Sequence, residues 1–302
     1  KLYQAQKRAT TTGDYKAMLL EQRPDIESIV VYGGEDADPV QYGKVFIALK
    51  PTGSASYSAA VKTSIKNDIL KKSNVVTVIP ELIDPIMYYL LIETTVNYDP
   101  VTNLTNENTL KTNINTSIQN YFQTNLEKFD QKFRYSKLVQ DIDNTNNSVR
   151  NNKTTVKYQQ RIIPGELGLT STYTMNFNNV ITEGSIVSTS FTASDGITYS
   201  LVDVGGIIKV AKTTSGVVDS PAVYFTLPDG TQNQGTIDYT TGKVVLNNFN
   251  PYTITDATAN IKFTVTPSVN NNDITPLREQ ILTYDVTDTE SIVINMVAET
   301  II

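Results

Sequence analysis

The stretch PDIESIVVYGGEDADPVQYGKVFIALKP, residues 24–51, decides how the first part of the chain folds. Two runs of apolar, β-branched and aromatic residues, 26–32 and 44–49, enclose a loop that opens with two glycines and holds three carboxylates. This pattern predicts a β-hairpin, because strand-forming runs flank turn-forming residues. It also raises the question of whether Glu35, Asp36 and Asp38 bind an ion, catalyse a reaction or only form the hairpin tip.

The loop carboxylates match a calcium site only in part. Asp36 and Asp38 have the alternate spacing of two calcium ligands, but Pro39 follows at once, and the later glycine and bidentate glutamate are missing. The alternative is an acidic tip in which Gly33 and Gly34 adopt positive φ and the carboxylates stay in water. We predict the acidic tip, with ion binding as the open alternative.

Outward from the hairpin, residues 1–163 mix helical and strand patterns. The predicted helices, read from apolar spacings of three and four, span 14–22, 56–71, 106–129 and 137–143. The further predicted strands span 75–79, 86–98 and 156–163. Asn106 and Ser136 are the predicted N-caps of the last two helices. We therefore expect an α+β domain over 1–163, with a small sheet covered by helices on one face.

Residues 164–270 lose the helical periodicity and show short strands separated by turn dipeptides. The predicted strands span 173–177, 186–191, 199–204, 207–210, 222–226, 235–238, 243–246 and 261–265. The turns include Asp195-Gly196, Gly205-Gly206, Asp229-Gly230 and Thr241-Gly242. This spacing predicts an all-β sandwich or barrel-like domain over 164–270.

The final stretch, 271–302, combines a helix-permissive piece at 275–282 with a strand-like piece at 292–297. We expect this stretch to return to the first domain or to lie at an interface. The chain begins at Lys1 without a methionine or the layout of a signal peptide, so the sequence is expected to be part of a longer protein.

Composition narrows the possible chemistry. The chain has no Cys, His or Trp among its 302 residues. Without Cys and His there are no disulfides, thiolate metal sites or Ser-His and Cys-His nucleophile pairs. No apolar run approaches the roughly 18 residues of a membrane span, so membrane insertion is not expected.

Charge is spread unevenly along the chain. Residues 1–163 hold 20 Lys+Arg and 17 Asp+Glu, whereas 164–302 hold 5 and 14. The net charge of −6 and pI of about 4.9 argue against a direct nucleic-acid partner. A basic half and an acidic half could make complementary contacts between subunits, although two domains with ordinary, differing surfaces would look the same.

Other candidate chemical groups have bland explanations. Glu81 and Asp84 form a carboxylate pair of the kind glycosidases use, but the sequence PELIDP also reads as a turn between strands. The serines of the β-rich part, Ser185, Ser188 and Ser194, have no histidine to activate them. Neither glycine pair has the following lysine of a phosphate-binding loop. The sequence therefore predicts no catalytic, cofactor-binding or metal site, and no enzyme.

Tyrosine is the dominant aromatic residue, with 17 copies, and many lie in predicted strands. Tyrosine is common at protein interfaces, because its ring is apolar and its hydroxyl is polar. Half-buried strand faces favour tyrosine as well, and for any single tyrosine this is the better explanation.

Residues 11–51, TTGDYKAMLLEQRPDIESIVVYGGEDADPVQYGKVFIALKP, resemble the J-like baseplate proteins of contractile-tailed bacteriophages. The features are Gly13-Asp14-Tyr15 leading into a helix, the Pro-Asp-Ile-Glu-Ser strand, and the strand from Tyr42 to Ile47. The form VVYGGEDADP is most similar to the large baseplate wedge proteins of T4-like phages, in their C-terminal portion. The likeness continues through Tyr98 in PELIDPIMYYLLIETTVNYDP, and the β-rich part fits by position alone.

The resemblance implies a structural protein of the virion tail baseplate, assembled in the host cytoplasm. It implies paired copies in a ring around the central hub, in contact with other wedge and hub-side proteins. These copies would hold the baseplate together during the conformational change that triggers sheath contraction. The resemblance carries over no catalytic or cofactor residues.

Two other function classes remain open from the residues alone. A phage tail adhesin could bind a host glycan on its β-rich part, although the lack of Trp removes the best sugar-stacking residue. A carboxylate enzyme such as a glycosidase would depend on Glu81 and Asp84. A glycan array would test the first, and substitution of the two carboxylates would test the second.

Overall fold

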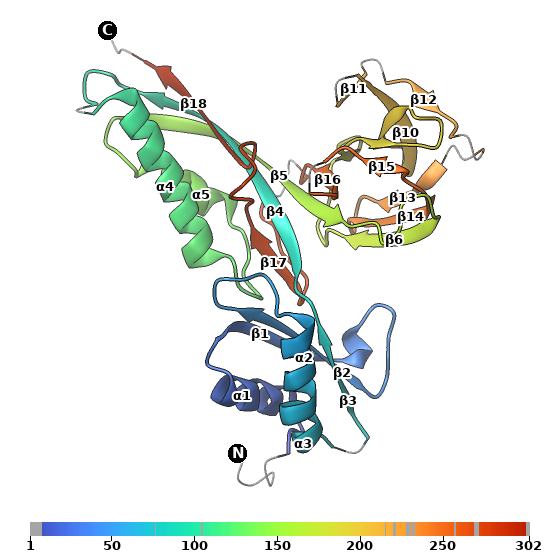
Figure 1. Cartoon of the computed structure of the whole chain (residues 1–302). Helices are drawn as coiled ribbons and strands as arrows, with labels where there is room; N and C mark the ends of the chain where they lie inside the picture. The colour runs from blue at the N-terminus through green and yellow to red at the C-terminus, as the bar shows by residue number, and fades with distance from the viewer. Residues whose placement is uncertain are drawn as a thin grey trace. The chain divides into compact units, whose positions relative to one another are not determined.

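The computed structural model describes residues 8–75, 77–103, 105–214, 216–219, 222–227, 230, 233–256, 258–268 and 272–299. The chain divides into two compact units. Unit 1 comprises Lys1–Met87, Leu126–Gln131 and Pro276–Ile281. Unit 2 comprises Tyr88–Asn125, Lys132–Thr275 and Leu282–Ile302. Helices accompany both a small sheet and a large sheet, which confirms the predicted α+β class (Figure 1).

These units divide the chain differently from the predicted domains. The predicted boundary after residue 163 lies inside unit 2, and unit 1 ends its first segment at Met87. Two later segments return to unit 1, including 276–281 from the final stretch. The reason is packing, because these returning segments supply buried side chains to the small sheet.

Unit 1 is built on a three-stranded sheet of order β1-β2-β3. Its elements in chain order are α1 (Thr12–Gln22), β1 (Ile26–Gly33), the 3-10 turn η1 (Gly34–Asp36), β2 (Lys44–Pro51), α2 (Ala59–Ser64), the π-helical turn η2 (Ile65–Leu70), α3 (Lys71–Ser73) and β3 (Ile79–Ile83). The predicted hairpin is confirmed, since β1 and β2 pair antiparallel. The segment from α2 to α3 is the crossover that brings β3 parallel to β2.

The two faces of this sheet bury different partners. Odd-numbered strand residues such as Val31 and Ile47 pack with α1 and the α2–η2 helix. Even-numbered residues such as Tyr32 and Phe46 pack instead with Phe129 and Ile281 of the returning segments. The period-two alternation of β1 and β2 explains this division. The helices named in the prediction thus cover one face, and chain segments distant in sequence cover the other.

The predicted strand at 75–79 is wrong. Val78 N–H donates to Val75 C=O in a turn, and β3 begins at Ile79, whose N–H donates to Gly43 C=O at 2.9 Å. The strand β3 therefore forms later than predicted, at the residues that pair with β2. The predicted following strand, at 86–98, is confirmed in its bounds but pairs outside the small sheet.

Unit 2 contains a framework of two long antiparallel strands covered by two helices. Its elements are β4 (Ile86–Tyr98), α4 (Glu107–Asn125), α5 (Tyr135–Asp143), β5 (Val149–Ile162) and β18 (Ile292–Ala298). The short strand β17 (Gln280–Thr283) also pairs with β4, and the first two residues of both β4 and β17 belong to unit 1. Figure 1 shows α4 and α5 along β4 and β5. The buried residues of α4, Leu110, Ile114, Ile118, Tyr121 and Phe122, all belong to the apolar face of the predicted helix 106–129. The predicted end at 129 is wrong, because α4 ends at Asn125 and leaves Leu126 and Phe129 of that face outside the helix.

One predicted helix cap is confirmed and one is wrong. The Asn106 side chain accepts a hydrogen bond from Thr109 N–H at 2.7 Å, as an N-cap does. The shorter helix α5 begins at Tyr135, one residue before Ser136, and its N-cap is Arg134 without a side-chain bond. The strand predicted at 156–163 begins earlier, at Val149, because β4 offers partners as far as Tyr98.

The β-rich part of unit 2 continues the same sheet through antiparallel pairs. Its strands are β6 (Ser171–Asn176), β7 (Val187–Ser188), β8 (Phe191–Thr192), β9 (Thr198–Val204), β10 (Ile207–Thr214), β11 (Val217–Val218), β12 (Tyr224–Phe225), β13 (Asn233–Asp238), β14 (Lys243–Phe249), β15 (Thr253–Ile254) and β16 (Ile261–Val265). The strand predicted at 186–191 is split into β7 and β8. Phe191 and Phe249 meet edge to face in the core, with ring centroids 5.0 Å apart.

The predicted turn at Gly205-Gly206 is confirmed. Both glycines have positive φ, +58° and +85°, in the two-residue loop between the paired strands β9 and β10. Asp229 of another predicted turn lies outside the described residues. Among the described helices, no apolar segment is long enough to span a membrane.

Candidate functional site

The loop between β1 and β2, which holds Glu35, Asp36 and Asp38, is folded back on the small sheet. A Cβ at Gly34 would lie 1.8 Å from Gln41 O, so close backbone approach requires glycine there. The expected positive φ at the glycine pair is wrong, because Gly33 has φ −75° and Gly34 lies outside the positive range. Asp36 forms an ion pair with Arg278 of a returning segment, in which Arg278 Nη2 lies 3.2 Å from Asp36 Oδ1. At least one carboxylate of the loop therefore braces unit 1.

Glu81 and Asp84 contact different cations. Lys44 Nζ lies 2.7 Å from Glu81 Oε2, and Lys62 Nζ lies 2.8 Å from Asp84 Oδ2. Each carboxylate thus links a strand or its end to another element of unit 1. A glycosidase pair needs two carboxylates that converge on one bond, and these two are instead each occupied by a lysine.

The three serines are separated by their contacts. Ser188 is buried; its hydroxyl accepts from Leu201 N–H at 2.7 Å and donates to Thr189 C=O at 2.9 Å. Ser185 Oγ accepts from Thr266 N–H at 3.2 Å, and Ser194 is exposed. The first two hydroxyls complete backbone hydrogen bonding. In the described part of the chain, no group of three or more carboxylates could hold a metal ion. The predicted lack of catalytic and cofactor residues stays a prediction.

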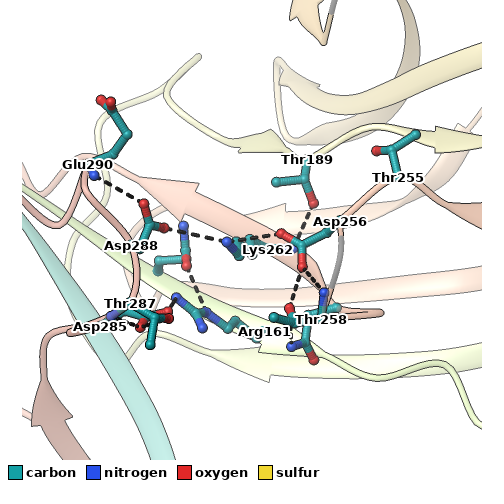
Figure 2. Close-up of polar contacts among 12 residues, drawn as sticks. Arg161, Thr189, Thr255, Asp256, Thr258, Lys262, Asp285, Thr287, Asp288 and Glu290 are labelled. Atoms are coloured by element: carbon teal, nitrogen blue, oxygen red, sulfur yellow. Dashed lines mark hydrogen bonds and ion pairs between the residues drawn. The ribbon is translucent and has the colours of Figure 1, made fainter.

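A charge network in unit 2 instead joins segments far apart in sequence. It fixes residues 282–299, which we call the strap, against β5 and β16. Arg161 of β5 lies with Nη2 2.7 Å from Asp285 Oδ2, and its guanidinium stacks 3.7 Å from the ring centre of Tyr89. The two charged side chains are only 12% and 13% exposed. Figure 2 shows Arg161 reaching from its strand to the loop of the strap.

A second cation holds the next turn of the strap. Lys262 of β16 lies between two carboxylates, with Nζ 2.9 Å from Asp256 Oδ2 and 3.4 Å from Asp288 Oδ2 (Figure 2). The Lys262 side chain is 14% exposed. Removing one member of such a buried group leaves an uncompensated charge, so the network specifies where the strap lies.

Asp285 and Asp256 of the network are held in their charged form. Burial opposes ionisation of Asp285, but hydrogen bonds from Thr287 and the charge of Arg161 outweigh it and lower its pKa to about 2. Burial likewise opposes ionisation of Asp256, and bonds from Thr258 and Lys262 outweigh it, so its pKa is also lowered. These carboxylates are therefore fixed anions near neutral pH, suited to holding cations and unsuited to exchanging protons.

Beyond the network, the strap ends in β18, which pairs parallel with β4 from Ile292 opposite Ile92 to Ala298 opposite Tyr98. A groove of about 660 Å³ separates the strap from α4. Amides and hydroxyls of α4 line one side, including Thr112 and Asn115, and acidic residues of the strap line the other. This groove and the outer edge of β18 form the candidate assembly surface.

The sequence reasoning missed this network. Two signals were present: cations inside apolar strands, in KYQQRII and NIKFTV, and repeated Asp-x-Thr pairs in DATAN and DVTDTE. A charged residue among strand residues is costly to bury unless it is paired, so Arg161 and Lys262 each required an acidic partner. The identity of those partners depends on tertiary contacts across more than a hundred residues in the case of Asp285.

Two segments of the chain, one before and one after Pro85, match family models of one and the same protein. Residues 11–83 match the family model described as baseplate structural protein gp6, C-terminal domain I. Residues 86–161 match the model for C-terminal domain III of the same protein. The baseplate wedge protein gp6 of Enterobacteria phage T4 is 25% identical over 248 residues, which are 78% of this chain and 36% of that protein. The chain thus spans about a third of the length of that relative.

Proposed function

We propose, from the premise that this chain is a gp6-like baseplate wedge protein of the phage virion, that it acts without enzymatic chemistry as a bracing and self-associating part of the tail baseplate. Copies pair, and the pairs close into a ring around the central hub. The ring contacts other wedge and hub-side proteins and holds the plate together during the change that triggers sheath contraction. It has no direct nucleic-acid partner and inserts into no membrane.

The observation that carries this proposal is the charge network of the strap. Arg161 and Lys262 lie on strands of the sheet, and both bind carboxylates of a segment that returns from the end of the chain. Buried ion pairs add little net stability, but they penalise every alternative position of the groups that they join. A part that must keep its shape while its neighbours move benefits from such fixed positions.

The groove gives weaker support to a glycan-binding adhesin. Tyr284 is its aromatic residue, and that ring already packs on Phe122 with centroids 4.9 Å apart. Among the described residues that line the groove, a sugar would therefore find amides and carboxylates but no free aromatic face. Assembly therefore remains the proposed function, and a glycan array tests the adhesin alternative.

Self-association is tested by light scattering of this chain over a wide concentration range, followed by negative-stain imaging of the full-length protein with its baseplate neighbours. We expect dimers of this chain, and rings only when the neighbours are added. Monodisperse monomer at high concentration would contradict the self-association. Loss of ring formation in Arg161→Ala, with pairing of isolated copies retained, would support the bracing role.

A further inference from the structure

The strand β18 is an edge without the usual protection. Its sequence, IVINMVA from Ile292 to Ala298, has no charged residue and no proline. It pairs with β4 on one side, and no other described strand pairs with it. Natural edge strands are normally short, charged, bulged or covered, because free N–H and C=O groups recruit another strand.

Two hydrogen bonds show which backbone groups are free. Ile92 N–H donates to Ser291 C=O and Glu299 N–H donates to Tyr98 C=O, both at 2.8 Å. In a parallel pair the residues of one strand alternate between facing the partner and facing away. The odd-numbered residues of β18 therefore face β4. The N–H and C=O groups of the even-numbered residues point outward: Ile292, Ile294, Met296 and Ala298.

We propose that a second copy of this chain occupies this edge, with β18 pairing antiparallel to β18 across a two-fold axis at Asn295. This names the surface for the self-association proposed above and rests on it. In this register Ile292 lies opposite Ala298, and Ile294 lies opposite Met296. All four outward residues then form hydrogen-bonded pairs, since residues that face the partner strand exchange both of their backbone bonds.

The charges beside the strand favour a second copy over an unrelated partner. Lys111 and Glu290 both line the groove, both are exposed, and neither side chain has a partner among the described residues. Figure 2 shows the Glu290 carboxylate directed away from the strap network. Glu290 precedes β18, whereas Lys111 lies toward its other end.

The direction of α4 places these two charges at opposite ends. Phe122 of α4 packs on Tyr284 at the start of the strap. Lys111 lies about 16 Å earlier along the helix axis, at 1.5 Å rise per residue, and so beside the later part of β18. A two-fold axis at Asn295 exchanges the ends of the strand. It therefore brings Lys111 of one copy beside Glu290 of the other, twice per dimer.

A charge swap tests the pairing, with the dimer dissociation constant of the whole chain measured by sedimentation equilibrium at low salt. Lys111→Glu or Glu290→Lys alone should weaken the dimer roughly three- to tenfold, because two attractive contacts become repulsive. The double variant should return to within about twofold of the original value. A purely structural role of either residue would not show this rescue.

A proline tests the backbone pairing. Met296→Pro removes an outward N–H and no bond to β4, so we expect roughly ten- to hundredfold weaker dimerisation from two lost hydrogen bonds per dimer. Asn295→Lys places two like charges on the axis and should also weaken the dimer. Asn120→Lys makes the same change on an exposed site facing the groove between α4 and α5 and should leave it unchanged. Circular dichroism and thermal unfolding confirm that each variant is folded.

The outcomes separate this inference from the proposed function. A dimer that resists Met296→Pro and shows no charge-swap rescue overturns the β18 pairing but leaves self-association standing. A chain that stays monomeric overturns both. Amides of 292–298 that become protected from hydrogen exchange only when another baseplate protein is added would assign the edge to that protein and overturn pairing between copies.

Discussion

The edge strands of the small sheet in unit 1 are protected against pairing with further strands, whereas the edge strand β18 of unit 2 is not. Strand β1 carries Glu27, which pairs with Lys50, and β3 carries Pro80 and Glu81. Because Ile79 N–H donates to Gly43 C=O, just before β2, Pro80 occupies the outward-facing position, where its missing N–H leaves nothing to recruit a neighbour. Strand β18 has neither device. The comparison indicates that one sheet is built to stay closed and the other to be extended.

The strap depends on its buried cation, and removing that cation should have the largest effect. Arg161→Ala leaves Asp285 buried and unpaired, so we expect the free energy of unfolding of unit 2 to fall by about 3–5 kcal/mol. Denaturant unfolding measures this, and hydrogen exchange should show faster exchange in β18. The control is Arg134→Ala, whose ion pair with Asp273 is 59% exposed at the arginine and should contribute less than about 1 kcal/mol. Equal effects of the two variants would refute the special role of the network.

The small sheet depends on its core, and the next largest effect comes from a cavity there. Ile47→Ala removes a fully buried side chain from the helix-covered face and should destabilise unit 1 by about 2–4 kcal/mol. Ile79→Ala changes the same residue type on β3 where it is 60% exposed, and should stay within about 0.5 kcal/mol. Denaturant unfolding followed by hydrogen exchange in β1 and β2 measures both. Exchange in β18 should not change in either variant.

The strap should loosen at acid pH. The pKa of Asp285 is lowered to about 2 in the folded chain, below the ordinary value near 3.9 of an unfolded chain. Its stabilisation, about 2 kcal/mol, is therefore present above pH 4 and is lost as pH falls toward 2. The stability gap between the original chain and Asp285→Asn should shrink over that range. A gap that stays constant from pH 6 to 2 would show that the aspartate does not titrate with folding.

The smallest effect concerns the charged edge of the small sheet. Glu81→Gln removes the ion pair with Lys44, whose side chains are 40% and 33% exposed. Water screens such a pair, so unfolding free energy should change by less than about 1 kcal/mol. The charge of Glu81 also hinders pairing of this edge with other strands. The variant should therefore self-associate or precipitate more readily, which light scattering measures. Unchanged solubility would weaken the contrast between the two edges.

Local sequence predicted those elements whose own side chains decide their structure. The bounds of β4 and the buried face of α4 follow from periodicity, because each stripe of apolar residues has one way to be buried. The hairpin of β1 and β2 and the turn at Gly205-Gly206 follow from turn chemistry. The absence of histidine and cysteine excluded the catalytic sites that depend on them.

Elements whose backbone hydrogen-bond partners lie in distant segments of the chain were predicted poorly. The helix-permissive stretch 275–282 is not helical: β17 begins at Gln280, since the edge of β4 offers it a ladder. The start of β5 at Val149 and of β3 at Ile79 were likewise set by partner strands. Local propensity was overruled in each case because pairing satisfies backbone groups that the segment alone could not.

By itself the sequence determined the α+β class, the positions of the long periodic elements and the likeness to baseplate proteins. Tertiary structure alone decided which aspartates meet Arg161 and Lys262, which segments cover the second face of the small sheet, and which edge stays open. The physical reason is range. Periodicity and turn chemistry act over a few residues, whereas ion pairs and strand edges depend on groups that only the folded chain brings together.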